Sequence, residues 1–195
     1  MIDKILQISK RELNSNIDYS KYIEIVKKVP NYQGFFFEEA GKEHYRLLSY
    51  ISSLYKDSLL IDIGTYQGFS ALALGYNQSN KVLSYDIIQN ESVDILKAYE
   101  ICSNITFNVQ NILNNFNIVH SSPFIILDTA HDGNFENIFI NKLIEEKWNG
   151  ILLMDDILEY PALYKIWNSI KLEKYELTSK GHWSGTGAIL FNGNY

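Results

Sequence analysis

The sequence predicts an α/β protein built on a doubly wound, mostly parallel sheet that finishes in an antiparallel hairpin. From about residue 59 onward, short and almost wholly apolar runs alternate with helical patterns, as expected for parallel strands covered on both faces. Near the end, two strand-like runs flank a connection that contains three glycines, which is typical of a hairpin. The chain has 195 residues, 46% of them apolar, which suits a single domain with a large core.

The N-terminal residues 1–55 are expected to form a helical region that covers the substrate side as a lid. Residues 1–29 are polar with apolar positions at helical spacing, and Pro30 then breaks the pattern. A second helix is expected from about Glu38 to Tyr55. The aromatic run Gly34-Phe35-Phe36-Phe37 between them is either a lid or a plug in the core. Residues 56–195 are expected to form the sheet-containing core.

The remaining elements follow in order along the chain. We expect seven strands, at Leu59–Ile63, Lys81–Asp86, Ile105–Val109, Phe124–Leu127, Ile151–Met154, Tyr175–Thr178 and Ala188–Phe191. Helices are expected between them, at Ser70–Tyr76, Glu91–Cys102, Phe135–Lys147 and Tyr160–Ile170, with a short polar segment after Val109. The result is a Rossmann-like seven-stranded sheet with an antiparallel C-terminal hairpin.

Charge and composition restrict the classes of partner and the compartment that we expect for this protein. Seventeen basic and 23 acidic residues give a net charge of −6, and such a surface repels nucleic acid. The lone cysteine, Cys102, cannot form an internal disulfide, which favours a reducing compartment. No signal peptide pattern opens the chain and no apolar run is long enough to span a membrane. We expect a cytoplasmic protein without membrane or nucleic-acid partners, with a homodimer left open.

A glycine-containing loop follows the first strand, in Asp62-Ile63-Gly64-Thr65-Tyr66-Gln67-Gly68-Phe69-Ser70. Ligands of open α/β sheets bind outside the carboxyl ends of the strands, and glycine lets the backbone approach a ligand closely. The Gly64 to Gly68 spacing differs from that of dinucleotide-binding loops, and no phosphate-binding lysine follows. The loop is either a cofactor site for a ligand without phosphates or a plain turn.

Asp86 ends the second strand, 18 residues after Gly68. An acidic residue at about this distance from a glycine loop accepts hydrogen bonds from a ribose diol. The alternative is a solvated acid in a loop, and the preceding glycines favour the ribose role.

Three carboxylates follow two further strands. Asp128 ends the fourth strand, and Asp155 and Asp156 end the fifth. If these strands are neighbours, the three side chains converge, and a cation must offset their repulsion. Magnesium prefers oxygen ligands of this kind. The alternative for Asp155 or Asp156 is to cap the next helix.

Three histidines have candidate roles that the sequence leaves open or favours. His131 lies three residues after Asp128, where it is either a proton acceptor for a hydroxyl or a packed bystander. His182 and Trp183 lie in the terminal hairpin, where they line a substrate pocket or anchor the hairpin by packing, and we favour packing. His44 is expected on a helix surface.

The segment Asp62–Ser70 resembles motif I of the class I methyltransferases that bind S-adenosylmethionine, most closely the magnesium-dependent catechol O-methyltransferase type. The likeness covers residues 41–157. It implies that Asp62, Gly64, Thr65, Tyr66, Gly68 and Ser70 bind the cofactor, with Gly64, Gly68 and Ser70 at its methionine end. It also implies that Asp86 binds the ribose and Asn111 the adenine, while Asp128, Asp155 and Asp156 hold Mg²⁺.

Two departures from the catechol type are visible. Asp156 stands where that family has asparagine, and His131 stands where it has a catalytic lysine. The pattern Asp-x-x-His looks more like bacterial sugar and macrolide O-methyltransferases that share this metal site. The resemblance therefore implies methyl transfer to a hydroxyl of a small molecule or sugar, with His131 and Asp128 as catalytic residues.

Two other functions stay open. One is metal-independent methyl transfer to nitrogen or a carboxylate, in which the acids would orient a polar acceptor. The other is a non-catalytic S-adenosylmethionine-binding or scaffold protein, since one fold hosts many functions.

Overall fold

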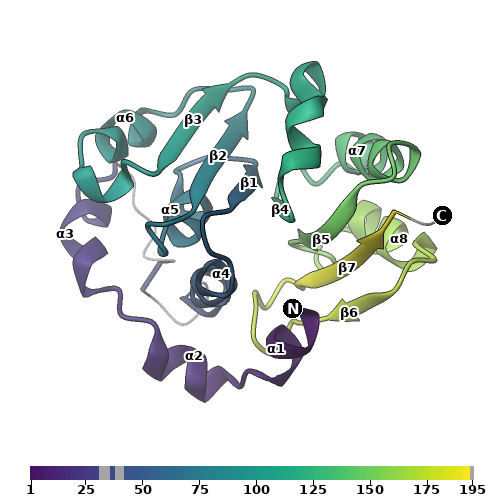
Figure 1. The fold of residues 1–195 in the computed structure, drawn as a ribbon, viewed down its shortest axis with the longest axis horizontal. Helices are drawn as coiled ribbons and strands as arrows, with labels where there is room; N and C mark the ends of the chain where they lie inside the picture. Colours follow the sequence, from purple (N-terminus) through teal and green to yellow (C-terminus); the bar gives the residue numbers. More distant parts are fainter. Residues whose placement is uncertain (31–35, 38–41, 194–195) are drawn as a thin grey trace.

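The computed structural model describes residues 1–30, 36–37 and 42–193 and contains a seven-stranded sheet of order β3-β2-β1-β4-β5-β7-β6 (Figure 1). Strands β1 to β5 pair in parallel, and β7 is antiparallel to both β5 and β6. The predicted fold class is confirmed, including the terminal hairpin. The strands are β1 (Leu59–Ile63), β2 (Lys81–Asp86), β3 (Ile105–Val109), β4 (Phe124–Leu127), β5 (Asn149–Met154), β6 (Lys174–Glu176) and β7 (Gly187–Asn192).

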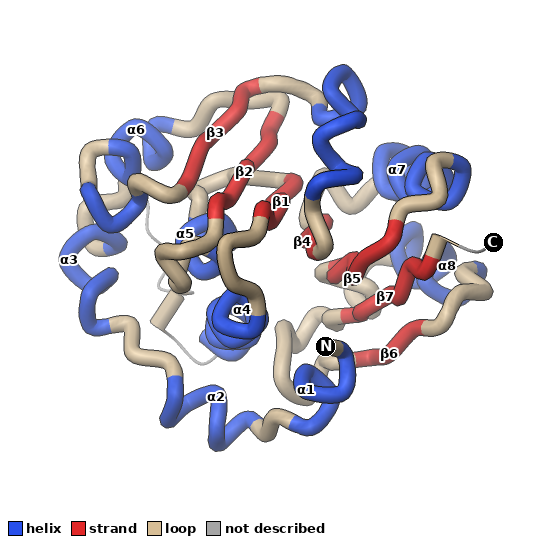
Figure 2. The backbone as a smooth tube through the Cα atoms, in the orientation of Figure 1, coloured by secondary structure: helices blue, strands red, loops and turns tan. Residues whose placement is uncertain are grey.

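Helices connect the strands and precede the sheet, as Figure 2 shows. The α-helices are α1 (Ile2–Gln7), α2 (Lys10–Asn16), α3 (Ile23–Val26), α4 (Lys42–Leu54), α5 (Phe69–Leu74), α6 (Glu91–Lys97), α7 (Asn134–Glu145) and α8 (Pro161–Ser169). In the described part of the chain, 3₁₀ segments accompany them at η1 (Ser20–Tyr22), η2 (Glu100–Cys102) and η3 (Ile112–Ser121). Among the described residues, no helix has both the length and the apolar character that crossing a membrane requires.

Two sequence predictions about helices were wrong. The helix expected over Glu91–Cys102 is divided into α6 and η2. The segment after Val109, expected to be short and polar, contains η3, which buries Ile112, Phe116 and Val119 against the sheet. Its polar residues hide this apolar spacing, because asparagines separate the buried positions.

Neighbouring residues of each central strand pack into opposite layers. In β1, Leu60 joins the core cluster that contains helices α1 to α5, whereas Ile61 joins the cluster beneath η3, α7 and α8. Both side chains are fully buried, and each such burial stabilises the fold by about 1.5–3 kcal/mol. This burial on both faces explains why the strands are apolar nearly throughout.

The N-terminal segment contacts the rest of the domain at both ends of its path around the molecule (Figure 1). Phe36 is fully buried and lies 4.9 Å from the Tyr45 ring and 5.7 Å from the Phe69 ring, measured between centroids. Phe36 is therefore a core plug, while Gly34, Phe35 and residues 38–41 of the expected helix lie outside the described residues. At the other end, Lys180 Nζ donates hydrogen bonds to the carbonyls of Ile5, Leu6 and Ile8.

The strand order reverses between β1 and β4, which is where open α/β sheets bind their ligands. The backbone N–H of Asp128, just after β4, donates to the carbonyl of Ile63 at the end of β1, at 2.9 Å. The loops that follow these two strands therefore begin side by side.

Candidate active site

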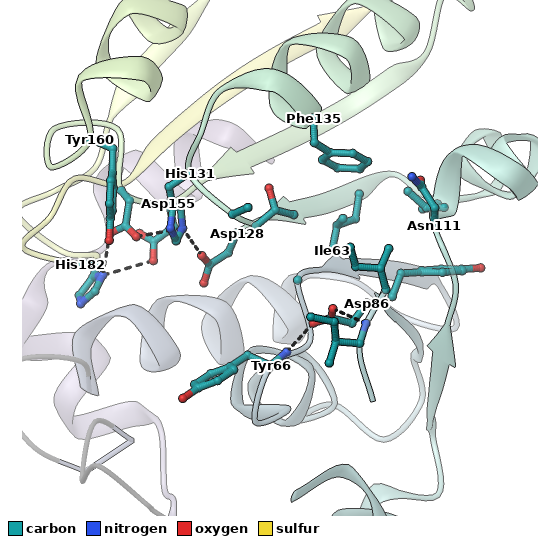
Figure 3. Close-up of a pocket in the computed structure, with 18 of the residues that line it drawn as sticks. Ile63, Tyr66, Asp86, Asn111, Asp128, His131, Phe135, Asp155, Tyr160 and His182 are labelled. Atoms are coloured by element: carbon teal, nitrogen blue, oxygen red, sulfur yellow. Dashed lines mark hydrogen bonds and ion pairs between the residues drawn. The ribbon is translucent and has the colours of Figure 1, made fainter. Parts of the chain in front are cut away.

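A cavity of about 730 Å³ opens at the carboxyl ends of the strands (Figure 3). This volume lies in the range of small-molecule and cofactor sites. Eight of the residues predicted for the site line it: Gly64, Tyr66, Asp86, Asn111, Asp128, His131, Asp155 and Asp156. Asp62, Thr65, Gly68 and Ser70 are not among its lining residues.

The two loop glycines are required by the backbone itself. Gly64 has φ +101°, and a Cβ there would lie 1.5 Å from the carbonyl oxygen of Asp128. Gly68 has φ +85°, and a Cβ there would lie 2.6 Å from Leu96 Cδ1. Because residue 64 is glycine, the loop after β1 can lie directly against the backbone of Asp128.

Asp62 lies behind the cavity wall and is fully buried. Ser84 Oγ donates to Asp62 Oδ2 at 2.5 Å, and Thr65 Oγ1 lies 2.5 Å from Ser84 Oγ. Burial raises the pKa of Asp62 to about 7, although hydrogen bonds from Ser84 and Ser70 oppose the rise. Asp62, Thr65 and Ser70 therefore form a buried polar support under the loop.

Asp86 is held by two backbone donors. Its Oδ2 accepts from Tyr66 N–H at 2.9 Å and its Oδ1 from Ile88 N–H at 3.0 Å. An ionised carboxylate has about four acceptor positions, so lone pairs remain for a diol in the cavity. Ile87 and Ile88, each 71% exposed, add an apolar surface beside Asp86 that the sequence analysis did not anticipate.

Asn111 has a structural role in addition to lining the cavity. Its side chain accepts a hydrogen bond from Leu113 N–H at 2.9 Å and so caps η3. Its neighbour Gln110 also lines the cavity.

His131 lies between two of the predicted metal ligands. Its Nε2 is 2.9 Å from Asp128 Oδ1 and 3.1 Å from Asp156 Oδ2. The Tyr160 ring stacks on the imidazole at 4.6 Å with an interplanar angle of 16°. The His131 backbone, at φ +61°, donates its N–H to Glu136 Oε1 at 3.0 Å. The imidazole is thus positioned from several sides.

A second group of side chains surrounds Asp155. His182 Nδ1 lies 3.2 Å from Asp155 Oδ2 and 3.5 Å from Asp156 Oδ1. His182 therefore lines the cavity, and packing alone does not describe it. Trp183 also lines the cavity and is 63% exposed, so it does not anchor the hairpin by burial.

The expectation that His44 lies on a helix surface was wrong. Its side chain is 4% exposed, and its Nδ1 lies 3.6 Å from Asp155 Oδ2. The reason is the orientation of α4, which turns His44 toward the same buried side as Leu47, Leu48 and Ile51. The helical spacing of His44 from Leu48 and Ile51 was the available signal.

The acids and histidines change one another's pKa values. Burial lowers the pKa of His182, but hydrogen bonds and charges from Asp155 and Asp156 outweigh this and raise it to about 10. Burial lowers the pKa of His131, but Asp128 and Asp156 raise it overall. Burial raises the pKa of Asp155, but His44 and His182 lower it overall. Desolvation raises the pKa of Asp128.

The donor set fits a divalent cation. Asp128, His131 and Asp156 place one ligand atom each within 4.8 Å of one another, and Asp155, Asp156 and His182 do the same. Asp155 and Asp156 are buried carboxylates, whose like charges require a positive partner. Carboxylate oxygens are the ligands that magnesium prefers.

No protein-family model matches the sequence, and no curated protein matches it. Solved structures do match. A SAH-bound methyltransferase from Podospora anserina is 15% identical with a TM-score of 0.65, covering 98% of this chain and 95% of that one. An O-methyltransferase from Bacillus cereus in complex with SAH is 14% identical with a TM-score of 0.63, covering 98% and 100%.

A third match is the O-methyltransferase TomG from Streptomyces achromogenes in complex with SAM, which is 12% identical with a TM-score of 0.60. The match covers 87% of this chain and 90% of the TomG chain. These likenesses show that the chain has the Rossmann-like fold of class I methyltransferases.

Proposed function

We propose that this protein is an S-adenosylmethionine-dependent O-methyltransferase that acts on a hydroxyl of a small molecule or sugar with the help of a divalent cation. The observation that carries the proposal is the convergence of Asp128, Asp155, Asp156 and His131 on one cavity that also contains Gly64 and Asp86.

The cofactor half of the proposed site is the side formed by the β1 and β2 ends. Gly64 offers backbone in the cavity wall, and Asp86 retains acceptor positions for the ribose diol. Asn111 and the exposed Ile87 and Ile88 line the same cavity as Asp86, and we assign them to the adenine. Buried Asp62, with an Oδ1 that has no hydrogen-bond partner among the described residues, supports the loop at the methionine end.

The acceptor half is formed by the β4 and β5 ends. Asp128, Asp155 and Asp156 would hold a divalent cation, which when bound would act as a Lewis acid and lower the pKa of the acceptor hydroxyl. His131 receives the hydroxyl proton. The acceptor oxygen then forms a bond to the methyl carbon as the carbon–sulfur bond breaks, and the electron pair of that bond returns to sulfur, leaving S-adenosylhomocysteine. Fixing the two reactants in line supplies much of the rate.

The test is methyl transfer from isotopically labelled S-adenosylmethionine to a panel of diols and sugars, with product detected by mass spectrometry. EDTA is expected to abolish turnover and added Mg²⁺ to restore it. Asp128→Ala and His131→Ala are each expected to lower kcat by at least ~100-fold. Asp94→Asn and His120→Ala are matched controls, because both side chains are exposed and lie outside the cavity. Turnover that survives both EDTA and Asp128→Ala would contradict the metal role.

A second candidate is metal-independent methyl transfer, which one observation favours. His131 and His182 together lie within ion-pair distance of all three acids, so protonated imidazoles can offset the negative charge without a metal. In that case EDTA leaves turnover unchanged, while His131→Ala still impairs it.

A further inference from the structure

His182 is built into the acid cluster by the loop that carries it. The loop joins the segment after β5 through three backbone hydrogen bonds, from Ile157 N–H to Gly185 and from Leu158 and Glu159 N–H to Ser184, at 3.1, 2.9 and 3.0 Å. That segment directly follows Asp155 and Asp156. The imidazole is therefore fixed relative to the two carboxylates by the backbone.

Side chains reinforce this arrangement. Thr186 Oγ1 accepts from His182 N–H at 2.7 Å and donates to Asp155 Oδ1 at 3.3 Å. Gly181 packs against the same threonine, because a Cβ there would lie 2.4 Å from Thr186 Oγ1. A single hydroxyl thus links the backbone of His182 to the carboxylate that its ring faces.

The atoms that could bind a metal in this group include both nitrogen and oxygen. Nδ1 of His182 lies 3.2 Å from Asp155 Oδ2 and 3.5 Å from Asp156 Oδ1, so one small ion can contact all three after modest adjustment. Oxygen ligands alone suit magnesium, whereas imidazole suits the first-row transition metals, whose affinities rise from Mn²⁺ toward Cu²⁺.

His44 gives an independent indication of a ligand. It is 4% exposed, and its Nδ1 is buried without a hydrogen-bond partner among the described residues. That nitrogen faces Asp155 Oδ2 at 3.6 Å. A buried donor beside a carboxylate that binds metal is the usual arrangement of outer-shell partners, which orient the ligand. Without such a role, a buried nitrogen that lacks a hydrogen bond is costly.

We propose that His182 is a metal ligand through Nδ1, together with Asp155 and Asp156, and that the centre prefers a transition-metal dication to Mg²⁺. The inference rests on the metal role in the proposed function. It concerns binding and not turnover, so a protein that fails to methylate any acceptor can still confirm it. The Ser184 hydroxyl, 2.7 Å from the same nitrogen, is the partner that the metal displaces.

The experiment titrates metal-stripped full-length protein with Co²⁺ or Mg²⁺, by calorimetry and by the visible absorption of bound Co²⁺. Wild type is expected to bind Co²⁺ at least ~10-fold more tightly than Mg²⁺. His182→Ala is expected to weaken Co²⁺ binding at least ~10-fold and to change its spectrum. His182→Gln, which offers an oxygen instead of the nitrogen, is expected to lower the ratio of Co²⁺ to Mg²⁺ affinity.

Two variants serve as controls. His120→Ala removes an exposed histidine that pairs with Glu146 and lies outside the cavity, and it is expected to bind Co²⁺ as wild type does. Ser184→Ala, which removes the competing hydroxyl, is expected to bind Co²⁺ at least as tightly as wild type. Equal affinities for Co²⁺ and Mg²⁺ in wild type, or equal loss in His182→Ala and His120→Ala, would overturn the proposal. So would a loss in Ser184→Ala as large as that in His182→Ala.

Discussion

Asp62→Asn is expected to make the ligand-free protein progressively more stable than wild type as the pH rises. Asp62 is fully buried, and its pKa is raised from 3.8 to about 7. Below pH 3.8 the carboxyl is protonated in both the folded and the unfolded chain. Between these two values the unfolded chain releases the proton and the folded chain retains it, so the folded state loses stability as the pH rises.

The size of this effect follows from the pKa difference. A rise from 3.8 to about 7 corresponds to about 4 kcal/mol of lost stability, complete once the pH exceeds the folded-state value. Asparagine has nearly the same shape and does not ionise. Any hydrogen bond that its amide makes or loses is independent of pH, so it cancels when the two proteins are compared across the pH range.

The assay is urea unfolding of wild type and Asp62→Asn at a series of pH values from 4 to 8, analysed by linear extrapolation. The difference in unfolding free energy is expected to grow by several kcal/mol toward pH 8 in favour of the variant. Asp94→Asn, at an exposed carboxylate, should show a nearly constant difference. A constant difference for Asp62→Asn would refute the claim that burial keeps this carboxyl neutral.

Three further variants test the architecture around the site. Gly64→Ala should abolish S-adenosylhomocysteine binding in calorimetry, since its Cβ would lie 1.5 Å from the Asp128 carbonyl oxygen; unchanged affinity would contradict this close approach. Phe36→Ala should cost about 3–5 kcal/mol in urea unfolding, because Phe36 is fully buried; a cost below about 1 kcal/mol would mean that it is no core plug. Lys180→Met should cost about 1–3 kcal/mol and speed amide exchange in α1, because it removes hydrogen bonds to three carbonyls; unchanged exchange would show that they do not hold the helix.

The sequence predicted the central strands well because they are buried on both faces. β1 and β4 have the predicted bounds, since a nearly continuous apolar run between turn residues leaves little ambiguity. β2 and β3 also have the predicted bounds, although their runs contain polar residues and are partly exposed. The same reasoning placed Gly64, Asp128 and Asp155 correctly at one edge, because parallel strands end on the same side.

The rest depended on packing between distant segments. His44 and His182 are 138 positions apart in the chain, yet their ring centroids lie 5.7 Å apart over Asp155. Nothing local in either segment specifies that contact, because it forms only when α4 packs against the sheet to which the terminal hairpin belongs. The support role of Asp62 was equally hidden, since its hydrogen bond comes from Ser84 of the neighbouring strand.

We propose that one cavity holds the cofactor and the acceptor side by side. A crystal structure with S-adenosylhomocysteine and a divalent cation would show whether it does. We expect the ribose on Asp86, the cation on Asp128, Asp155 and Asp156, and the free coordination positions of the cation facing the sulfur across the cavity. A cofactor bound away from Asp86, or a cavity with the cofactor but no cation on these acids, would contradict it.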